Sequence, residues 1–360
     1  MGQLTVNNKW SSKKNLKILF MLVFVLSSSA LGQVPSIERA ALLDLYIFTD
    51  GSNWKTNTGW NGPAGTECNW FGVTCSGGKV WSIDLQNNSL SGTIPPRLSY
   101  LTDLRHLFLP QNSLSGNIPP ELGNLLNLKQ LWLADNSLSG ALPVELSNLT
   151  NLTYLSISRN QLAGNIPPEL GNLVNLEYLY LRDNKLSGNI PSNLWNLRDL
   201  SVLSLHGNSL SGRISAQVGQ LTRLIHLELS TNELTGTIPP EIGKLTKLTG
   251  LYLYSNELTG VIPNALSSLT NLAGLSLSRN NLTGRIPASL GKLTKLTRLY
   301  LYSNELTGVI PVELGSLEDL TTLYLYNNSL SGSIPRELGN LANLRNLDLG
   351  VNKLTGSIPS

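Results

Sequence analysis

One asparagine recurs at every 24th position over most of this chain, from Asn88 to Asn352, without an insertion or deletion. Around each of these anchor asparagines the sequence repeats the frame L-x-L-x-x-N-x-L-(S/T)-G-x-I-P-x-x-L-G-x-L-x-x-L. A fixed period of this length specifies stacked supersecondary units, none of which can bury its apolar residues alone. The chain has 360 residues, 41 % of them apolar, with 32 glycines and 18 prolines spread along it, which excludes collagen, a coiled coil and an acidic disordered tail. The anchors are Asn88, Asn112, Asn136, Asn160, Asn184, Asn208, Asn232, Asn256, Asn280, Asn304, Asn328 and Asn352.

The positions of the frame have separate physical roles. Leucines spaced by two, such as Leu299 and Leu301, share one face of a short strand, so Tyr300 and Tyr302 point the other way. Stacked strands then form a parallel sheet, and each anchor asparagine can pair with backbone groups that the turn leaves buried. The glycine permits positive φ and the proline fixes the backbone, so we expect a looser turn where Ser215 replaces proline.

The first 32 residues read as a secretory signal peptide. Lys13, Lys14 and Lys17 precede an apolar run at 18–26, and small residues follow it, with cleavage expected after Gly32 or Ala30. The run is shorter than the roughly 20 residues needed to span a bilayer, so a membrane anchor is the weaker alternative. The net charge of +3 comes from the lysines of this leader, which argues against a nucleic-acid surface. The mature chain is therefore expected to be secreted, without a membrane span.

The repeat resembles that of the plant-type leucine-rich repeat family, whose 24-residue unit carries the signature L-(S/T)-G-x-I-P. The resemblance covers residues 80–360, and the preceding stretch from Cys68 to Cys75 matches the C-x-W-x-G-V-x-C motif of that family's N-terminal cap. It implies an α/β solenoid, a right-handed superhelix with a parallel β-sheet on its concave face and a helical cap. It also implies a disulfide between Cys68 and Cys75. The cap segments D-G-S-N-W and N-T-G-W are more similar to the caps of secreted bacterial or algal members of the family than to those of land-plant members.

The expected domains are the signal peptide at 1–32, the cap at 33–79 and twelve repeats at 80–360, the last one incomplete. The cap should begin with a helix that buries one apolar stripe and ends at Asp50. Because Ser360 comes soon after the last anchor, a truncated record, a frayed last coil and a partner-covered end all stay open. The helix stripe comprises Ile37, Ala41, Leu42, Leu45 and Phe48, and the tryptophans expected to help cover the first coil are Trp54, Trp60, Trp70 and Trp81.

The outward strand positions are where we expect a ligand to bind. Nine of the eleven tyrosines fall there, although the frame demands no apolar residue at these positions. Tyrosine combines a rigid apolar face with a hydroxyl group, and arginines beside it could hold a carboxylate or phosphate. The competing explanation is that tyrosines suit strand surfaces and were copied when residues 244–263 were duplicated as 292–311. The expected ligand-binding residues are Phe108, Trp132, Tyr178, Tyr180, Arg182, Tyr252, Tyr254, Arg298, Tyr300, Tyr302, Tyr324 and Tyr326.

The sequence favours binding over catalysis. It has no nucleophile elbow, no phosphate loop and no crowded carboxylates, and its histidines stand in different columns or distant repeats, so we expect no enzyme, metal or cofactor. The expected protein is a secreted recognition module for an extracellular protein, peptide or glycan. The alternatives are an ectodomain fragment of a receptor-like protein, an inhibitor of a secreted hydrolase, and an adhesion scaffold without a defined ligand.

Overall fold

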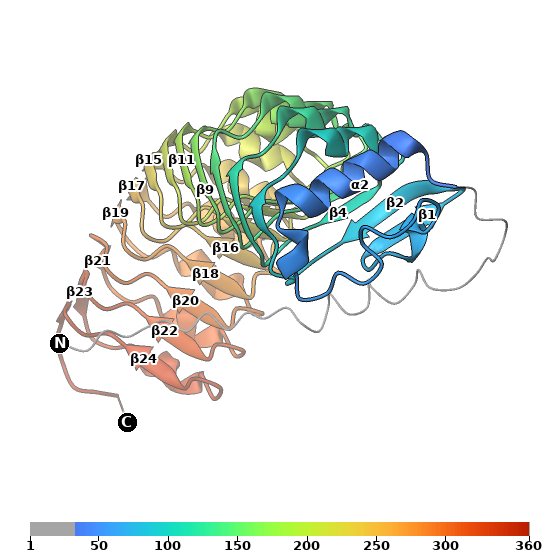
Figure 1. Cartoon of the computed structure of the whole chain (residues 1–360). Helices are drawn as coiled ribbons and strands as arrows, with labels where there is room; N and C mark the ends of the chain where they lie inside the picture. Colours follow the sequence, from blue (N-terminus) through green and yellow to red (C-terminus); the bar gives the residue numbers. More distant parts are fainter. Residues whose placement is uncertain (1–32, 360) are drawn as a thin grey trace. The chain divides into compact units, whose positions relative to one another are not determined.

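A computed structural model describes residues 33–359, and the expected signal peptide lies outside the described residues. These residues form a solenoid in which each coil contributes strands to two separate sheets (Figure 1). The main sheet has thirteen strands, parallel except for the first pair. Its strands, in spatial order, are β1 Val73–Ser76, β2 Lys79–Asp84, β4 His106–Phe108, β6 Gln130–Trp132, β8 Tyr154–Ser156, β10 Tyr178–Tyr180, β12 Val202–Ser204, β14 His226–Glu228, β16 Gly250–Tyr252, β18 Gly274–Ser276, β20 Arg298–Tyr300, β22 Thr322–Tyr324 and β24 Asn346–Asp348.

The main sheet keeps one register from rung to rung. Tyr180 of β10 lies beside Ser204 of β12, and Tyr300 of β20 lies beside Tyr324 of β22, as the 24-residue period requires. Leucines such as Leu299 are fully buried, while Tyr300 is partly exposed on the other side of its strand. The fold class and the parallel sheet predicted from the repeat are therefore confirmed.

The second sheet was not predicted from the sequence. It forms where each chain segment turns after the anchor asparagine, and it divides into a nine-stranded and a three-stranded part. Hydroxyl groups of its strands help to bind the rungs together, since Thr259 donates to the carbonyl of Gly236 at 3.3 Å. The strands are β3 Ser91–Thr93, β5 Ser113–Asn117, β7 Ser137–Gly140, β9 Gln161–Asn165, β11 Lys185–Asn189, β13 Ser209–Arg213, β15 Glu233–Thr237, β17 Glu257–Val261, β19 Asn281–Thr283, then β21 Thr307–Gly308, β23 Ser329–Gly332 and β25 Lys353–Leu354.

Each coil closes through a short 3-10 helix that follows the Ile-Pro pair. The proline at its start holds an extended conformation, and Ser215 adopts the same one, with φ −68° and ψ 144°. Its hydroxyl accepts a hydrogen bond from the Gln217 amide at 3.2 Å, so the expected looser turn is wrong. The repeat helices are η3 Pro96–Tyr100, η4 Pro120–Asn124, η5 Val144–Asn148, η6 Pro168–Asn172, η7 Ser192–Asn196, η8 Ala216–Gln220, η9 Pro240–Lys244, η10 Asn264–Ser268, η11 Ala288–Lys292, η12 Val312–Ser316 and η13 Arg336–Asn340.

The anchor asparagines join consecutive rungs, as the sequence predicted. The Oδ1 atom of Asn280 accepts a hydrogen bond from the amide of Leu258 in the preceding rung, at 3.0 Å. Its Nδ2 donates to the carbonyls of Leu253 at 3.0 Å and Leu277 at 3.1 Å. One buried side chain thus satisfies backbone groups of two rungs that water cannot reach.

The cap begins with helix α2 Ser36–Phe48, followed by η1 Gly51–Asn53 and η2 Glu67–Asn69. Of the predicted stripe, Ala41, Leu42 and Leu45 are buried. The prediction was wrong for the other two residues of the stripe, because Ile37 is 53 % exposed and Phe48 is 51 % exposed. Glu38 is buried instead.

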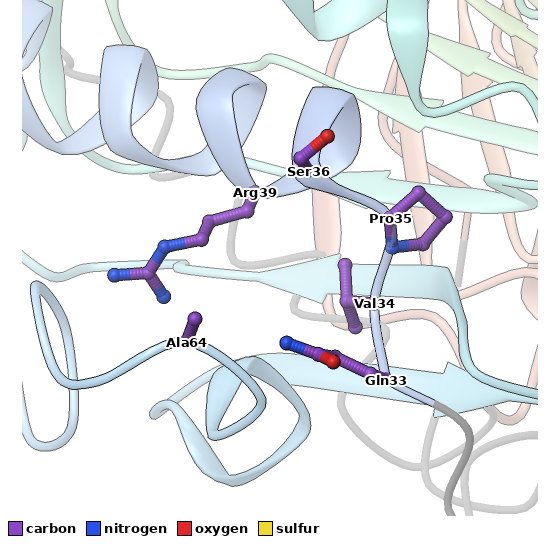
Figure 2. Close-up of a pocket in the computed structure, with 6 residues that line it drawn as sticks. All are labelled: Gln33, Val34, Pro35, Ser36, Arg39 and Ala64. Carbon is purple, nitrogen blue, oxygen red and sulfur yellow. The ribbon is translucent and has the colours of Figure 1, made fainter.

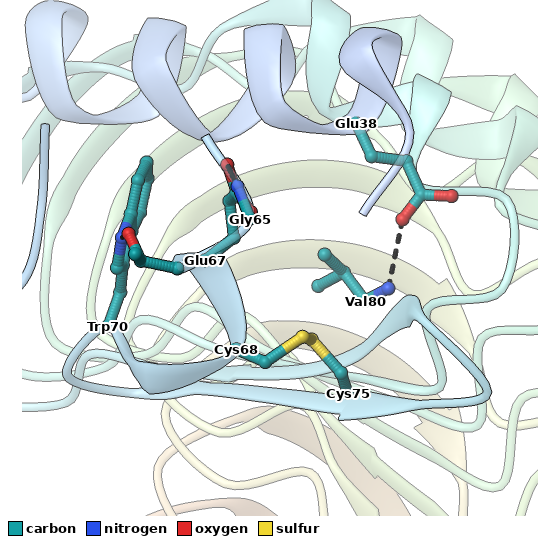
Figure 3. Close-up of a disulfide and its surroundings, with 8 residues drawn as sticks. Glu38, Gly65, Glu67, Cys68, Trp70, Cys75 and Val80 are labelled. Carbon is teal, nitrogen blue, oxygen red and sulfur yellow. Dashed lines mark hydrogen bonds between the residues drawn. A yellow bond between two sulfur atoms is a disulfide. The ribbon is translucent and has the colours of Figure 1, made fainter. Parts of the chain in front are cut away.

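Glu38 is buried because its carboxylate ties the helix to the first rung (Figure 3). The Val80 amide donates to Oε2 of Glu38 at 2.9 Å, and Nζ of Lys79 lies 2.9 Å from Oε1. The disulfide between Cys68 and Cys75 is present and links η2 to β1, as the family resemblance implied. Both links fasten the cap to the edge of the main sheet.

Three of the four expected cap tryptophans pack together. Ring centroids lie 4.9 Å apart for Trp54 and Trp60 and 5.1 Å apart for Trp60 and Trp70, with Tyr46 beside them. The prediction that Trp81 belongs to this cluster was wrong. Trp81 lies in β2 and contacts His106 of the next strand, with ring centroids 4.7 Å apart. It belongs to the surface of the main sheet and not to the cap cluster.

Candidate ligand-binding face

The outward side chains of the main sheet form one continuous surface, here called the sheet face. Outward positions lie six, four and two residues before each anchor asparagine, and register aligns them in columns across the rungs. All predicted binding residues lie on this face and are partly exposed. They are Phe108, Trp132, Tyr178, Tyr180, Arg182, Tyr252, Tyr254, Arg298, Tyr300, Tyr302, Tyr324 and Tyr326.

The structure divides the aromatic residues of the sheet face into two groups. The first, the aromatic ladder, runs over strands β2 to β10 with consecutive ring centroids 4.7 to 6.2 Å apart. Trp81, His106 and Tyr154 extend it beyond the predicted set. Parity had placed His106 and Tyr154 on the face, whereas Trp81 stands seven residues before Asn88, outside the three columns, and reaches the ladder through its contact with His106. Its members are Trp81, His106, Phe108, Trp132, Tyr154, Tyr178 and Tyr180.

The second group, the tyrosine tile, consists of Tyr300, Tyr302, Tyr324 and Tyr326. Tyr302 and Tyr326 stack with centroids 4.5 Å apart and an interplanar angle of 8°, and Tyr300 lies 5.4 Å from Tyr324. The guanidinium carbon of Arg279 lies 6.0 Å from the centroid of Tyr302. The tile therefore offers a contiguous set of rings with a cation at its border.

Tyr252 and Tyr254 stand apart from both groups. The ring of Tyr252 lies over bare backbone, because a Cβ on Gly250 would be 2.7 Å from its Cε2 and one on Gly274 would be 2.6 Å from its hydroxyl. The ring of Tyr254 lies 6.0 Å from that of His206. The two glycines thus determine how Tyr252 can lie.

Charged residues line one border of the aromatic ladder. Asp183 is close to three cationic or titratable groups: Arg159 at 3.6 Å, His206 at 3.7 Å and Arg182 at 4.0 Å. Arg182 therefore already faces a carboxylate of its own chain. Sequence reasoning missed this group because the residue before each anchor asparagine holds positive φ, as in Arg159 at 53° and Asp183 at 55°, which turns its side chain sideways along the rungs.

Burial changes the acidity of several tyrosines on the face. Burial raises the pKa of Tyr154 to about 12 and also raises the pKa of Tyr180. The pKa values of Tyr252, Tyr254 and Tyr300 are raised for the same reason, and the positive charge of Arg298 partly offsets the shift at Tyr252 and Tyr300. These hydroxyls stay protonated at physiological pH and can donate hydrogen bonds.

We expect these buried hydroxyls to make the fold sensitive to alkali. The pKa of Tyr154 is about 12 in the folded chain and about 10 in an unfolded one, so the folded state holds the proton more tightly. The associated stability is present below pH 10 and is lost as the pH rises toward 12. Urea unfolding from pH 8 to 11.5 should show this decline, and Tyr154→Phe should reduce it. An equal decline in wild type and Tyr154→Phe, with Tyr100→Phe as control, would contradict the assignment.

A pocket of about 310 Å³ lies in the cap, away from the sheet face (Figure 2). Its one charged residue, Arg39, is already bound by the Glu67 carboxylate and by the Gly62 carbonyl at 2.6 Å. The pocket therefore offers a ligand no unpaired charge.

Comparison with protein families matches leucine-rich repeat models along most of the chain. A model described as a leucine-rich repeat region matches residues 160–281, and a leucine-rich repeat model matches 294–354. A third model for single leucine-rich repeats matches 79–101, 103–125, 127–149 and 271–293.

Similar proteins include a curated plant protein and two solved structures, one of them of a plant receptor kinase. Protein MALE DISCOVERER 2 of Arabidopsis thaliana is 42 % identical over 73 residues, which cover 20 % of this chain and 11 % of that protein. The PEPR1-AtPEP1 crystal structure aligns with TM-score 0.83 and 37 % identity, over 89 % of this chain and 46 % of that chain. The Arabidopsis receptor kinase HAESA, in complex with the peptide hormone IDA and the co-receptor SERK1, aligns with TM-score 0.81 and 36 % identity, over 89 % of this chain and 55 % of that chain.

The chain spans about a tenth of the curated relative's length and about half of each of the two aligned structures. No helix within residues 33–359 is both long and apolar enough to cross a membrane. What the alignments share with this chain is the repeat solenoid that carries the sheet face.

Proposed function

Since the chain belongs to the leucine-rich repeat family, we propose that it is an extracellular recognition protein whose sheet face binds an extended peptide without catalysing a reaction. The observation that carries this proposal is the placement of nine tyrosines on the sheet face, where the repeat requires none of them. Tyrosine rings fixed on a rigid sheet lose little conformational freedom when a ligand binds, which favours affinity.

The spacing of the two aromatic groups supports an elongated ligand. Five strand steps separate β10, at the end of the aromatic ladder, from β20, at the start of the tyrosine tile. At about 4.8 Å per step this is about 24 Å, which about seven residues of extended peptide would cover. The HAESA complex with a peptide hormone supports a peptide in preference to a glycan.

An extracellular location is part of the proposal. The disulfide between Cys68 and Cys75 is typical of oxidising compartments, and the leader sequence reads as a secretory signal. A receptor ectodomain is the second candidate, because the aligned chain of the receptor kinase HAESA extends beyond the aligned region. Transcript sequence downstream of the codon for Ser360 would separate the two.

The test is a binding screen of the full chain against extracellular peptides, secreted proteins and glycans, followed by a hydrogen-exchange footprint of each binder. We expect protection of main-sheet peptides that contain β10, β20 and β22, with no protection of β9, β11 or β15 in the second sheet. A footprint confined to the second sheet would refute the proposed face. A glycan binder protecting the same strands would replace the peptide as ligand class.

A further inference from the structure

Between the aromatic ladder and the tyrosine tile the sheet face carries short side chains and one carboxylate. Serines and glycines occupy half of the outward positions there, and the carboxylate belongs to Glu228 at the end of β14, which is half-buried. The short residues on neighbouring strands are Ser204, Ser230, Gly250, Gly274, Ser276 and Ser278. A half-buried carboxylate has a desolvation cost, so its partners are informative.

Glu228 is only partly satisfied by its own chain. The hydroxyl of Ser204 donates to Oε2 at 2.6 Å. Within residues 33–359 no group donates to Oε1, and no lysine, arginine or histidine nitrogen lies within 4.0 Å of the carboxylate. One carboxylate oxygen is therefore left for a partner.

Aromatic rings surround this carboxylate. Register places Tyr252 on the next strand directly beside Glu228, and Tyr180 beside Ser204 on the other side. The negative charge of Glu228 adds to burial in raising the pKa of Tyr180, Tyr252 and Tyr254, so all three hydroxyls lie within its electrostatic reach. Neutral ring faces next to a carboxylate are the environment that stabilises ammonium and guanidinium groups.

His226, a titratable residue on the same strand, does not neutralise Glu228 at physiological pH. Burial lowers the pKa of His226, which lies two residues earlier on the same strand, and Glu228 offsets this only partly. The nearest arginines in the columns of the sheet face are Arg182, which faces Asp183, and Arg298, three strands further along. The positive charge of Arg298 also acts on Tyr252, where it opposes the effect of Glu228.

We infer that Glu228, together with the rings of Tyr180, Tyr252 and Tyr254, forms a subsite for a cationic group, such as the ammonium of a lysine in the bound peptide. This inference rests on the proposed function and specifies its ligand: an extended peptide with a cation near its centre and groups that stack on rings toward both ends. The ammonium would donate to the unpartnered Oε1 atom while its methylene groups lie against the ring of Tyr252.

The probe is Nα-acetyl-lysine methylamide, compared with Nα-acetyl-norleucine methylamide, which has a similar chain without the charge. Saturation-transfer NMR with the full chain should show the lysine probe binding at least tenfold more tightly than the norleucine probe. Glu228→Gln should remove at least fivefold of the lysine affinity. Glu257→Gln, an exposed glutamate at the start of β17 in the second sheet, is the matched control and should change nothing.

Equal binding of the two probes, no binding of either at 20 mM, or equal effects of Glu228→Gln and Glu257→Gln would each overturn the subsite. The tests of the subsite and of the proposed peptide-binding function can be distinguished. A screened ligand that needs the tyrosine tile but is unaffected by Glu228→Gln refutes only the subsite. Lysine binding at Glu228, without any ligand that depends on the tile, refutes only the proposed peptide-binding function.

Discussion

We expect Asn280→Ala to lower the free energy of unfolding by about 3 kcal/mol, a large effect for the loss of one polar side chain. Asn280 is buried, accepts from the amide of Leu258 and donates to the carbonyls of Leu253, Leu277 and Ser278. Alanine would leave the Leu258 amide without its partner and would remove one hydrogen bond from each of the three carbonyls, in a buried site. Each unsatisfied buried group costs about 1–3 kcal/mol.

Urea denaturation followed by circular dichroism measures this loss. Asn281→Ala is the matched control, since Asn281 is the next residue and is exposed on the second sheet. The control should stay within about 0.5 kcal/mol of wild type, as is usual for surface substitutions. If Asn280→Ala unfolds at the same urea concentration as Asn281→Ala, the anchor asparagines do not stabilise the coil.

We expect replacement of the whole tyrosine tile by serine to weaken binding of the screened ligand at least 100-fold, or about 2.7 kcal/mol. The four tyrosines, Tyr300, Tyr302, Tyr324 and Tyr326, supply stacked rings and hydroxyls on adjacent rungs. All four point away from the leucine core, so the variant should keep its fold. Isothermal titration calorimetry measures the affinity, and circular dichroism checks that the variant is folded.

The control for the tile is Tyr100→Ser, an exposed tyrosine of η3 that lies off the sheet face. It should leave the affinity unchanged. A folded tile variant that binds as tightly as wild type would show that the tyrosines are ordinary strand-surface residues, copied with the repeat. The aromatic ladder would then be the remaining candidate surface.

The sequence predicted the features that depend on period and parity. A step of 24 residues determines which leucines point inward and which tyrosines point outward, and the structure places Tyr324 and Tyr326 on the sheet face accordingly. The bonding of anchor asparagines between rungs follows equally, because a polar side chain that recurs inside every coil must satisfy backbone groups there. The family resemblance supplied the disulfide between Cys68 and Cys75.

The remaining features depend on three-dimensional neighbours that no single repeat specifies. The helical pattern placed Ile37 and Phe48 in the buried stripe of α2, but Glu38 is buried there by its bond to Val80. Likewise, Asp183 forms its ion pair with Arg159 where both residues have positive φ. The sequence alone does not predict this conformation for aspartate or arginine. Pairings of this kind set the details of the candidate site.

The duplicated segment shows how one substitution and a change of neighbouring rungs alter the packing of a repeated tyrosine. Tyr252 is the counterpart of Tyr300, yet Tyr252 lies over Gly250 and Gly274, while Tyr300 packs against Tyr324 on the next rung. Two stretches that differ only at Gly250, which is Arg298 in the copy, thus contribute either a lone ring or part of a tile. In a protein that gains or loses whole repeats, the order of the repeats therefore helps to determine which surface is available for binding. Recombination could therefore create new specificities from old rungs while leaving every leucine in place.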